Sequence, residues 1–391
     1  MNKSLKVAVV HEWLAGYAGS ERVVEQMLQV FPQADLFAIV DFLPPAERAM
    51  LGGRAVQTSF IQKMPLARRY FRGYLPLMPL AVEQWDLSAY DIILSSSHAV
   101  AKGVLTRADQ LHISYVHTPL RYAWDLSHEY LRQARLGWGP RGLLARALLH
   151  YLRLWDRASA DRVDVFLANS RYVAQRIEKT YRRASRVLYP PVDVHKVAAQ
   201  TQKQDYYLAA SRLVPYKRID LIVEAFREMP DRKLVVIGDG PQRKKIERRA
   251  TANIQLLGYQ DDQALARHLE QAKALVFAAD EDFGILPVEA QAAGTPVICL
   301  GRGGATETVR DGETGIFFHE QSAEAIVQAV RQFEASGVSE DAASISRWAD
   351  RFNSQRFREE LAAVVAEEWN RFSQGEIRHT RTTGTVRVRI T

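Results

Sequence analysis

The feature that most constrains the fold of this chain is a repeated alternation of short apolar runs with segments of helical periodicity. Several of the apolar runs are almost continuously hydrophobic, which is typical of parallel strands covered on both faces. The expected strands are 5–10, 92–95, 111–116, 163–168, 206–210, 234–237, 254–257, 274–278 and 296–300. The expected helices include 21–30, 171–181, 219–227, 262–271 and 288–293. Strand followed by helix, repeated in this way, predicts an α/β fold with doubly wound parallel sheets.

The length of 391 residues is that of two domains of ordinary size. The adjacent prolines Pro190 and Pro191 can neither continue a helix nor lie in a central strand, so they predict an extended linker with a cleft beside it. The expected parts are an N-terminal domain, a C-terminal domain, helices that can return to the N-terminal domain, and a basic tail: 1–189, 190–345, 346–372 and 373–391.

Composition excludes several classes of protein. A hydrophobic content of 47% excludes a disordered chain, and the single cysteine, Cys299, excludes a disulfide scaffold. No Cys/His spacing resembles a zinc site. No apolar run approaches the ~18 residues that span a bilayer, and no secretory leader precedes the first expected strand. The sequence therefore predicts a soluble, cytoplasmic protein.

The net charge of +7 is unevenly distributed. Residues 1–195 contain 25 Lys and Arg against 17 Asp and Glu, whereas residues 196–391 contain 27 against 28. A basic half indicates an anionic partner (nucleic acid, an acidic membrane surface or a phosphorylated substrate) or else an ordinary solvated surface. No helix-turn-helix, finger or RNA-binding pattern accompanies it, which disfavours nucleic acid.

Polar and glycine residues follow the expected strands, at the edge where open α/β sheets bind ligands. The loop containing Gly16 and Gly19 lacks the G-x-G-x-x-G pattern, so the nicotinamide fingerprint is absent. This loop forms either a tight turn or an anion site at a helix start. His117 is either structural or a positioner and proton acceptor. His11 and His98 are more simply explained as structural residues.

Arg212 and Lys217 lie five residues apart, directly after the expected strand 206–210. A diphosphate is well bound by a planar guanidinium together with a flexible ammonium, which this pair supplies. The alternative is a solvated basic loop.

Glu281 and Glu289 are separated by seven residues that include Gly284, Ile285 and Pro287. Pro287 suits the first turn of a helix, which would place Glu281 in the preceding loop and Glu289 in that turn. One carboxylate can then accept hydrogen bonds from sugar hydroxyls and the other from a ribose, beside free backbone N–H groups. Glu289 alone would also be explained by compensation of the helix dipole.

Together these segments resemble the retaining family-4 glycosyltransferases, which have the GT-B architecture of two facing Rossmann-like domains. The strongest part is 281–290, which is similar to the family's E-x7-E signature, and 211–218 is similar to its G-R-L-x-x-x-K-G segment. Shorter matches at 238–241, 294–297 and 303–307 occur in the same order and spacing. The resemblance runs from the first glycine loop to about residue 370.

The resemblance implies roles for individual residues. The implied catalytic residues are His117, Arg212, Lys217 and Glu281. The implied donor-binding residues are Gly19, Arg212, Lys217, Gly258, Tyr259, Glu281, Phe283, Gly284, Ile285, Leu286 and Glu289. The implied acceptor-binding residues are Gly16, Gly19, His117 and Arg121. The route of retaining transfer implied by the family is a front-face one, since no covalent nucleophile is evident.

Two departures from the family pattern occur. Ala18 precedes Gly19 where the family often has paired glycines, and Ser211 replaces a frequent glycine before Arg212. Asp280 and Asp282 also mimic the D-x-D metal motif of another glycosyltransferase class, but they lie inside the E-x7-E frame. We therefore expect no metal and no cofactor, only a nucleotide-sugar co-substrate.

Residues 115–125 and 281–285 resemble the bacterial mannosyltransferases of O-antigen and exopolysaccharide assembly, which implies GDP-mannose as the donor. Segments 54–85 and 132–162 mix arginine with aromatic residues and leucine, as interfacial membrane surfaces do. They predict a polyprenyl-diphosphate-linked saccharide acceptor and peripheral association with the inner face of the cytoplasmic membrane. The alternative is that these leucines face the core.

Other functions stay open at this point. The same fold can use a UDP-sugar donor such as UDP-glucose or UDP-N-acetylglucosamine, or act as a GT-B sugar epimerase. A nucleic-acid-binding protein is less consistent with the motifs. A nicotinamide-dependent dehydrogenase is disfavoured by the missing glycine fingerprint.

Overall fold

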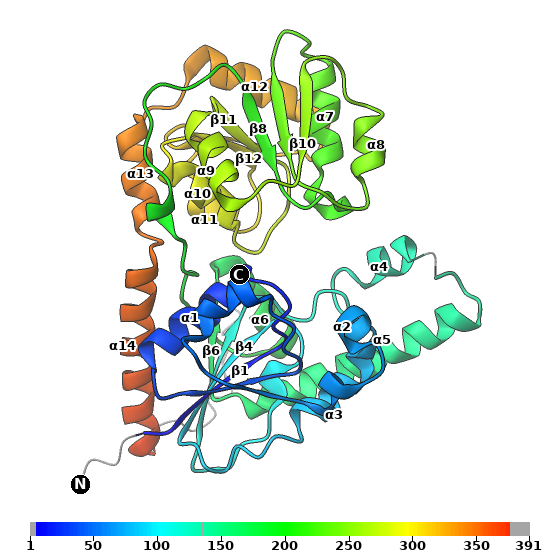
Figure 1. Cartoon of the computed structure of the whole chain (residues 1–391), viewed down its shortest axis with the longest axis vertical. Helices are drawn as coiled ribbons and strands as arrows, with labels where there is room; N and C mark the ends of the chain where they lie inside the picture. The colour runs from blue at the N-terminus through cyan, green and yellow to red at the C-terminus, as the bar shows by residue number, and fades with distance from the viewer. Residues whose placement is uncertain (1–4, 135, 376–391) are drawn as a thin grey trace, which may run out of the picture. The chain divides into compact units, whose positions relative to one another are not determined.

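The computed structural model describes residues 5–134 and 136–375, which form two compact units. Among the described residues, the first unit contains 5–190 with 357–375, and the second contains 191–356. The expected domain boundary at 189/190 lies one residue before this division. Each unit is built on a parallel sheet with helices on both faces (Figure 1), and the doubly wound α/β prediction is confirmed in both.

The sheet of the first unit has the strand order β3-β2-β1-β4-β5-β6-β7, the order of a doubly wound nucleotide-binding domain with one added strand. Its strands are β1 (Val7–His11), β2 (Asp35–Ala38), β3 (Val56–Thr58), β4 (Ile92–Ser97), β5 (Leu111–Val116), β6 (Val165–Ala168) and β7 (Arg186–Val187). Its helices are α1 (Gly19–Val30), α2 (Ala67–Tyr70), α3 (Met78–Val82), α4 (Ser127–Gln133), α5 (Pro140–Ser159), α6 (Arg171–Tyr181) and most of α14 (Ser354–Ser373).

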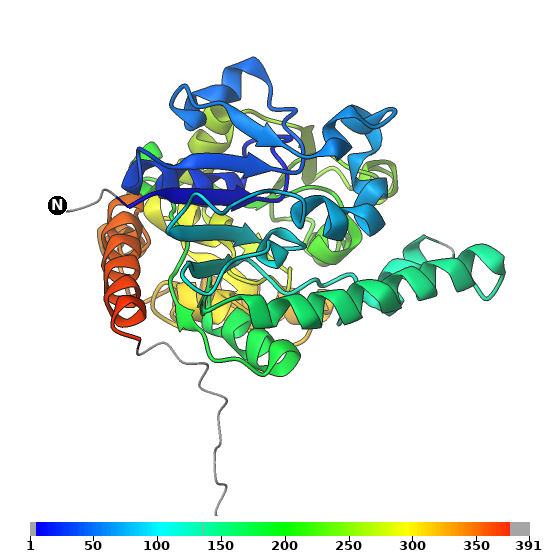
Figure 2. The ribbon, with the colours of Figure 1, turned by 90° about the horizontal axis from the view of Figure 1, so that it is seen from below.

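Alternating side chains of β1 pack in two separate hydrophobic cores, because successive residues of a strand point to opposite faces of the sheet. Val7 and Val9 pack with α1 and α14, whereas Ala8 and Val10 pack with the segments around α3 and α5. The helix α5 continues outward beyond the sheet in both views (Figures 1 and 2). Much of its length is therefore not covered by the core of the first unit.

The second unit has the strand order β10-β9-β8-β11-β12-β13. Its strands are β8 (Tyr207–Ala210), β9 (Leu234–Ile237), β10 (Ile254–Gly258), β11 (Ala274–Phe277), β12 (Val297–Leu300) and β13 (Gly315–Phe318). Its helices are α7 (Ile219–Arg227), α8 (Arg243–Glu247), α9 (Asp262–Gln271), α10 (Ile285–Ala292), α11 (Ala305–Thr308), α12 (Ala323–Ser336) and α13 (Ala342–Asp350).

The C-terminal helices divide between the units. Helix α13 packs on α10 in the second unit. Helix α14 begins where Asn353 accepts a hydrogen bond from the Arg356 N–H, and from Phe357 onward it belongs to the first unit. Its apolar residues Leu361 and Val364 then lie in the core beneath β1. Each such side chain stabilises the fold by about 1.5–3 kcal/mol. Of the expected basic tail, residues 376–391 lie outside the described residues.

No helix in the described ranges is long and apolar enough to cross a membrane.

Candidate functional site

In the second unit, glycines hold together the loops that follow β8 and β9. A Cβ atom on Gly238, whose φ is +133°, would lie 1.8 Å from the carbonyl oxygen of Ser211. A Cβ atom on Gly240 would lie 2.6 Å from the carbonyl oxygen of Leu213. The Leu213 N–H donates to the Asp239 carbonyl at 2.8 Å. This close backbone approach needs glycine, and it fixes the loop that carries Arg212 and Lys217.

The structure brings Lys217 together with Glu281, although 64 residues separate them in the sequence. The Lys217 ammonium donates to Glu281 Oε1, which joins the loop after β8 to the loop after β11. Both side chains are largely buried, with 16% and 20% of their surfaces exposed. Arg212 is exposed instead, and it donates to the hydroxyl of Tyr216 at 3.0 Å. One cation is thus held in place while the other is accessible to an anion.

The Glu281 loop is also fixed by the glycine loop that follows β12. The Gly304 N–H donates to the Glu281 carbonyl at 2.8 Å. A Cβ atom on Gly304 would lie 2.2 Å from the Cα of Phe283, and one on Gly303 would lie 2.4 Å from the Glu281 carbonyl oxygen. Any larger residue would therefore displace the loop that carries Glu281.

Helix α10 starts earlier than the sequence predicts. Gly284, with φ +88°, precedes its first residue, Ile285, so Pro287 is the third helical residue and Glu289 the fifth. The prediction that Glu289 lies in the first turn is therefore wrong. A proline is tolerated at any position of the first turn whose N–H has no partner within the helix, so Pro287 did not have to be the first helical residue. Glu289 is half-buried in the second turn, and Ile285 and Leu286 occupy the first turn.

Three other predicted donor-binding positions differ in which of their groups a ligand can reach. The ring of Phe283 is buried against Phe352, 5.5 Å between centroids, so only its main chain is available to a ligand. Gly258, with φ +70°, ends β10, and its carbonyl accepts from the Gly238 N–H at 2.8 Å. The ring of Tyr259, which follows it, is 76% exposed.

In the first unit, a hydrogen-bonded chain runs through the carboxyl ends of β1, β4 and β5. His117 Nε2 lies 2.9 Å from Ser96 Oγ, and Ser96 Oγ lies 3.2 Å from His11 Nδ1. His11 Nε2 in turn lies 3.5 Å from Glu21 Oε1. Burial and the charges of His98 and His11 hold the pKa of His117 well below its usual value, so this imidazole is neutral.

This hydrogen-bonded network ends at Glu21. Burial alone would raise the pKa of Glu21, but the hydrogen bond and charge of His11 and the Ser20 hydroxyl lower it to about 2. The ionised Glu21 carboxylate accepts from His11 Nε2–H. His11 Nδ1 lies 3.2 Å from Ser96 Oγ and 3.3 Å from the Ser96 carbonyl oxygen, so Ser96 joins His11 to His117.

The same carboxylate ties down the glycine loop. Glu21 Oε2 accepts from the Ala18 N–H at 3.2 Å, and Glu47 accepts from the Tyr17 N–H at 2.6 Å. The N–H groups of Tyr17 and Ala18, in the loop where the sequence predicts a tight turn or an anion site, are therefore already hydrogen-bonded. Gly19 is the first residue of α1, and nothing approaches Gly16 closely enough to require glycine there.

Glu12, which the sequence analysis did not select, organises the loop after β4. Its fully buried carboxylate accepts from the backbone N–H groups of His98, Ala99, Val100 and Ala101 at 2.7–3.1 Å. Burial raises the pKa of Glu12, but the charge of His98 and these N–H groups outweigh it, so the pKa is lowered. The signal in the sequence was an acidic residue directly after a fully buried strand.

Arg121, a predicted acceptor-binding residue, lies in the loop after β5 beside Asp125, with 3.9 Å between Nε and Oδ2.

In the described part of the chain, no three His, Cys, Asp or Glu side chains are placed to hold a metal ion.

Known structures contain the same two kinds of unit. Anabaena Alr3699/HepE, crystallised in complex with UDP and glucose, superposes with a TM-score of 0.66 at 15% identity, covering 93% of this chain and 100% of that chain. Residues 17–196 match the family model described as Glycosyltransferase Family 4, and residues 193–351 match the one described as Glycosyl transferases group 1. The chain carries both domains of a GT-B glycosyltransferase.

The names of two relatives of this glycosyltransferase contain different substrates. The GDP-mannose-dependent alpha-(1-6)-phosphatidylinositol monomannoside mannosyltransferase of Mycolicibacterium smegmatis is 29% identical over 258 residues, 55% of this chain and 66% of the relative. The D-inositol 3-phosphate glycosyltransferase of Mycobacterium leprae is 32% identical over 147 residues, 35% of this chain and 34% of the relative. The matched regions thus span between a third and two thirds of these relatives.

Proposed function

We propose that this chain is a retaining glycosyltransferase that transfers mannose from GDP-mannose to a lipid-linked saccharide. The observation that carries the proposal is the pairing of Lys217 with Glu281 beside the exposed Arg212, at the ligand-binding edge of the second unit. Among the relatives, the mannosyltransferase of M. smegmatis supports the choice of donor.

In this proposal Arg212 and Lys217 bind the donor diphosphate. Their charges stabilise the nucleoside diphosphate as it leaves, and such preorganised electrostatic stabilisation is usually the largest single contribution to catalysis. Glu281 leaves its pairing with Lys217 to accept hydrogen bonds from hydroxyls of the transferred sugar, and Glu289 accepts from the ribose. The main chain at Gly258 and the ring of Tyr259 flank the base.

The proposed acceptor-side residues belong to the first unit. The neutral imidazole of His117 can form a hydrogen bond with a substrate hydroxyl through Nδ1, because Nε2 is paired with Ser96. Gly19 offers its N–H at the start of α1, where the helix dipole favours an anion. We assign Gly16 and Arg121 to the same acceptor region.

The surface of helix α5 supports the proposal of a lipid-linked acceptor, because the exposed face of this helix is apolar. Leu143, Ala147, Tyr151 and Leu154 follow one another at spacings of three and four residues and are all exposed. Leu152, on another face, is buried in the core. The leucines of this helix therefore divide between the core and the surface.

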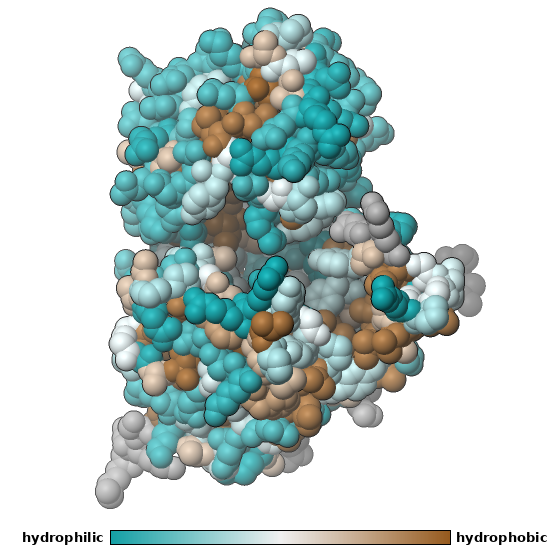
Figure 3. Space-filling model, turned by 45° about the vertical axis from the view of Figure 1, so that its right-hand side comes forward, coloured by the Kyte–Doolittle hydropathy of each residue, from teal (hydrophilic) through white to brown (hydrophobic). Residues whose placement is uncertain are grey.

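A second apolar surface lies close to α5. Leu66 and Leu80, from the segment 54–85, are 71% and 49% exposed, while Phe71 and Met78 between them pack in the same core as Leu152. Figure 3 shows hydrophobic patches on the surface of the unit that carries these segments. Arg68, Arg69 and Arg72 of the same segment are exposed, and anionic headgroups add about 1 kcal/mol per well-placed cation. We propose that this face binds the cytoplasmic leaflet.

Vesicle sedimentation tests the membrane part of the proposal. We expect the protein to sediment with phosphatidylglycerol vesicles at low salt, and to be released by high salt or by replacing the anionic lipid with phosphatidylcholine. The double variant Leu143→Glu/Leu154→Glu should stay in the supernatant, whereas Leu105→Glu, at another exposed leucine of the same unit, should sediment like the wild type. Equal sedimentation of both variants would contradict a binding face on α5.

A nucleotide-sugar panel tests the donor. Wild-type protein is incubated with GDP-mannose, UDP-glucose and UDP-N-acetylglucosamine, and release of the nucleoside diphosphate is measured. We expect GDP-mannose to be the best substrate and GDP to raise the melting temperature more than UDP does, because a ligand at 100 times its Kd adds ~2.7 kcal/mol of stability. Preference for a UDP-sugar would favour the second candidate, which the complex of Alr3699/HepE with UDP and glucose suggests.

A further inference from the structure

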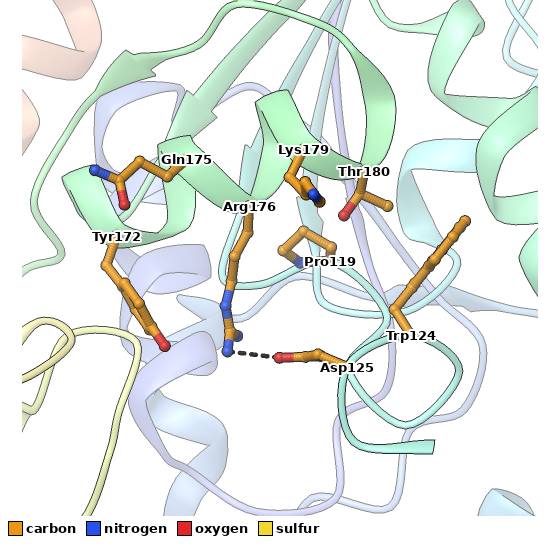
Figure 4. A pocket seen from close by; sticks show the side chains of 8 residues that line it. All are labelled: Pro119, Trp124, Asp125, Tyr172, Gln175, Arg176, Lys179 and Thr180. Carbon is orange, nitrogen blue, oxygen red and sulfur yellow. Dashed lines mark hydrogen bonds and ion pairs between the residues drawn. The ribbon is translucent and has the colours of Figure 1, made fainter. Parts of the chain in front are cut away.

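A pocket of about 300 Å³ lies in the first unit, between the loop after β5 and helix α6. It is lined by Pro119, Trp124, Asp125, Tyr172, Gln175, Arg176, Lys179 and Thr180 (Figure 4). None of these residues is among those assigned above to the donor, to the acceptor or to the membrane. The pocket combines aromatic walls with polar side chains at its opening.

The aromatic wall is fixed from behind. The Trp124 indole N–H donates to Asp156 Oδ2 at 2.7 Å, and Asp156 is fully buried. Lys102 Nζ lies 2.8 Å from the same carboxylate, and the Tyr181 hydroxyl donates to it at 3.1 Å. Figure 4 shows the Trp124 ring almost edge-on, with one face turned toward the pocket. This face is therefore a preorganised flat apolar surface.

The charges at the pocket do not cancel. Arg176 is neutralised, because its guanidinium donates to Asp125 at 2.6 Å and to the hydroxyl of Thr118 at 3.2 Å, and it also lies over the ring of Tyr172. Lys179 is exposed and has no hydrogen-bond or ion-pair partner within the described residues. The pocket consequently keeps one positive charge that an incoming anion can neutralise.

The pocket is connected to the proposed acceptor residues. Thr118, which Arg176 contacts, directly follows His117, and the side-chain amide of Asn169 before α6 donates to the His117 carbonyl at 2.9 Å. A group bound between Trp124 and α6 is thus held by the same loop that positions His117.

We infer that this pocket is a subsite for a sugar ring that bears an anionic group, an inference that rests on the proposed function and specifies its acceptor. The apolar face of the ring packs on Trp124 and Pro119, and its hydroxyls bond with Gln175 and Thr180. The anion pairs with Lys179. A sugar phosphate and a uronic acid share this chemistry.

Binding in the absence of any donor tests the inference. The probes are glucose 1-phosphate, methyl glucuronide, neutral methyl glucoside and inorganic phosphate, followed by the indole N–H resonance of Trp124 and by calorimetry. We expect at least one of the two anionic sugars to bind about tenfold or more tightly than the glucoside and than phosphate, since a charge-assisted contact has that value. The tighter of the two identifies the anion as phosphate or carboxylate.

Two variants complete the test. Lys179→Met should abolish the preference for the anionic sugar and leave the weak binding of the glucoside unchanged, whereas Lys244→Met, the same change at an exposed lysine of α8, should have no effect. Trp124→Phe, which keeps an aromatic face, should weaken all sugars less than Trp124→Ala does. Equal affinity for the glucoside, or equal behaviour of Lys179→Met and Lys244→Met, would overturn the inference.

The two proposals fail separately. If the protein turned over a nucleotide sugar but bound no anionic sugar, the inference about the pocket would be wrong and the proposed function would stand. If an anionic sugar bound in the pocket but no nucleotide sugar were turned over, the proposed function would be wrong and the sugar-binding site would stand.

Discussion

The two units carry the same kind of parallel sheet, yet the edges of these sheets are built from different chemistry. In the second unit the edge consists of glycine loops that lock exposed or half-buried charges, Lys217 with Glu281 and Arg212 beside them. In the first unit the edge is a buried hydrogen-bonded chain through His117, Ser96 and His11. The contrast teaches that one architecture can present accessible charges at the edge of one sheet and a buried hydrogen-bonded network at the edge of another.

The largest effect should come from removing the charged site. Lys217→Ala should lower turnover 10²–10³-fold, because it removes one preorganised donor to the developing charge, a contribution of about 2.7–4 kcal/mol. The measurement is nucleoside diphosphate release under saturating donor. Lys245→Ala, at an exposed lysine of α8, is the matched control and should retain full activity. A Lys217 variant as active as this control would show that the charged edge of the second unit is not the donor site.

The pH dependence of the free energy of unfolding tests the hydrogen-bonded network through Glu21. Its pKa is about 2 in the folded protein against 4.5 ordinarily, so the unfolded state binds more protons between these values. The stability that Glu21 contributes, on the order of 3 kcal/mol, is present above pH about 4.5 and is lost as the pH falls toward 2. Glu21→Gln should remove this part of the acid dependence in urea unfolding. Glu178→Gln, at an exposed carboxylate of α6, should reproduce the wild-type curve, and a Glu21 variant that did the same would rule out this coupling.

A smaller effect is expected from Ser96→Ala, which interrupts the chain between His11 and His117. The hydroxyl is the partner of His117 Nε2, so its loss should allow His117 to exchange between tautomers. Nitrogen-15 NMR of the histidine rings should show one tautomer of His117 in the wild type and a mixture in the variant. Turnover should fall about tenfold or less. Identical histidine spectra of the two proteins would contradict a role of Ser96 in orienting His117.

Much of the fold follows from the sequence, because long apolar runs and clear helical periods dominate their local structure. The helices predicted at 171–181 and 219–227 have the bounds observed. The strands β2, β3, β7 and β13 were missed. The strands β3 and β7 have only three and two residues, and β2 and β13 begin at Asp35 and Gly315, residue types that are depleted in strands.

The site was predicted unevenly. Arg212, Lys217 and Glu281 could be selected from the sequence because their motifs are local, and the structure pairs Lys217 with Glu281. The partnership of His11 with Ser96 was not, because it depends on β1 pairing with β4 in a register that places these two residues opposite each other, 85 residues apart. The inward orientation of Phe283 similarly depends on Phe352, which no local pattern connects to it.

The most direct test of the central claim measures release of GDP from GDP-mannose by the wild-type protein and by Arg212→Ala, with each protein's fold checked by its melting temperature. We expect turnover in the wild type, a loss of at least about 100-fold in the variant, and equal melting temperatures, because Arg212 is exposed and, within the described residues, its side chain hydrogen-bonds only to the Tyr216 hydroxyl. Equal turnover by the two proteins would contradict the assignment of this edge to the nucleotide-sugar donor.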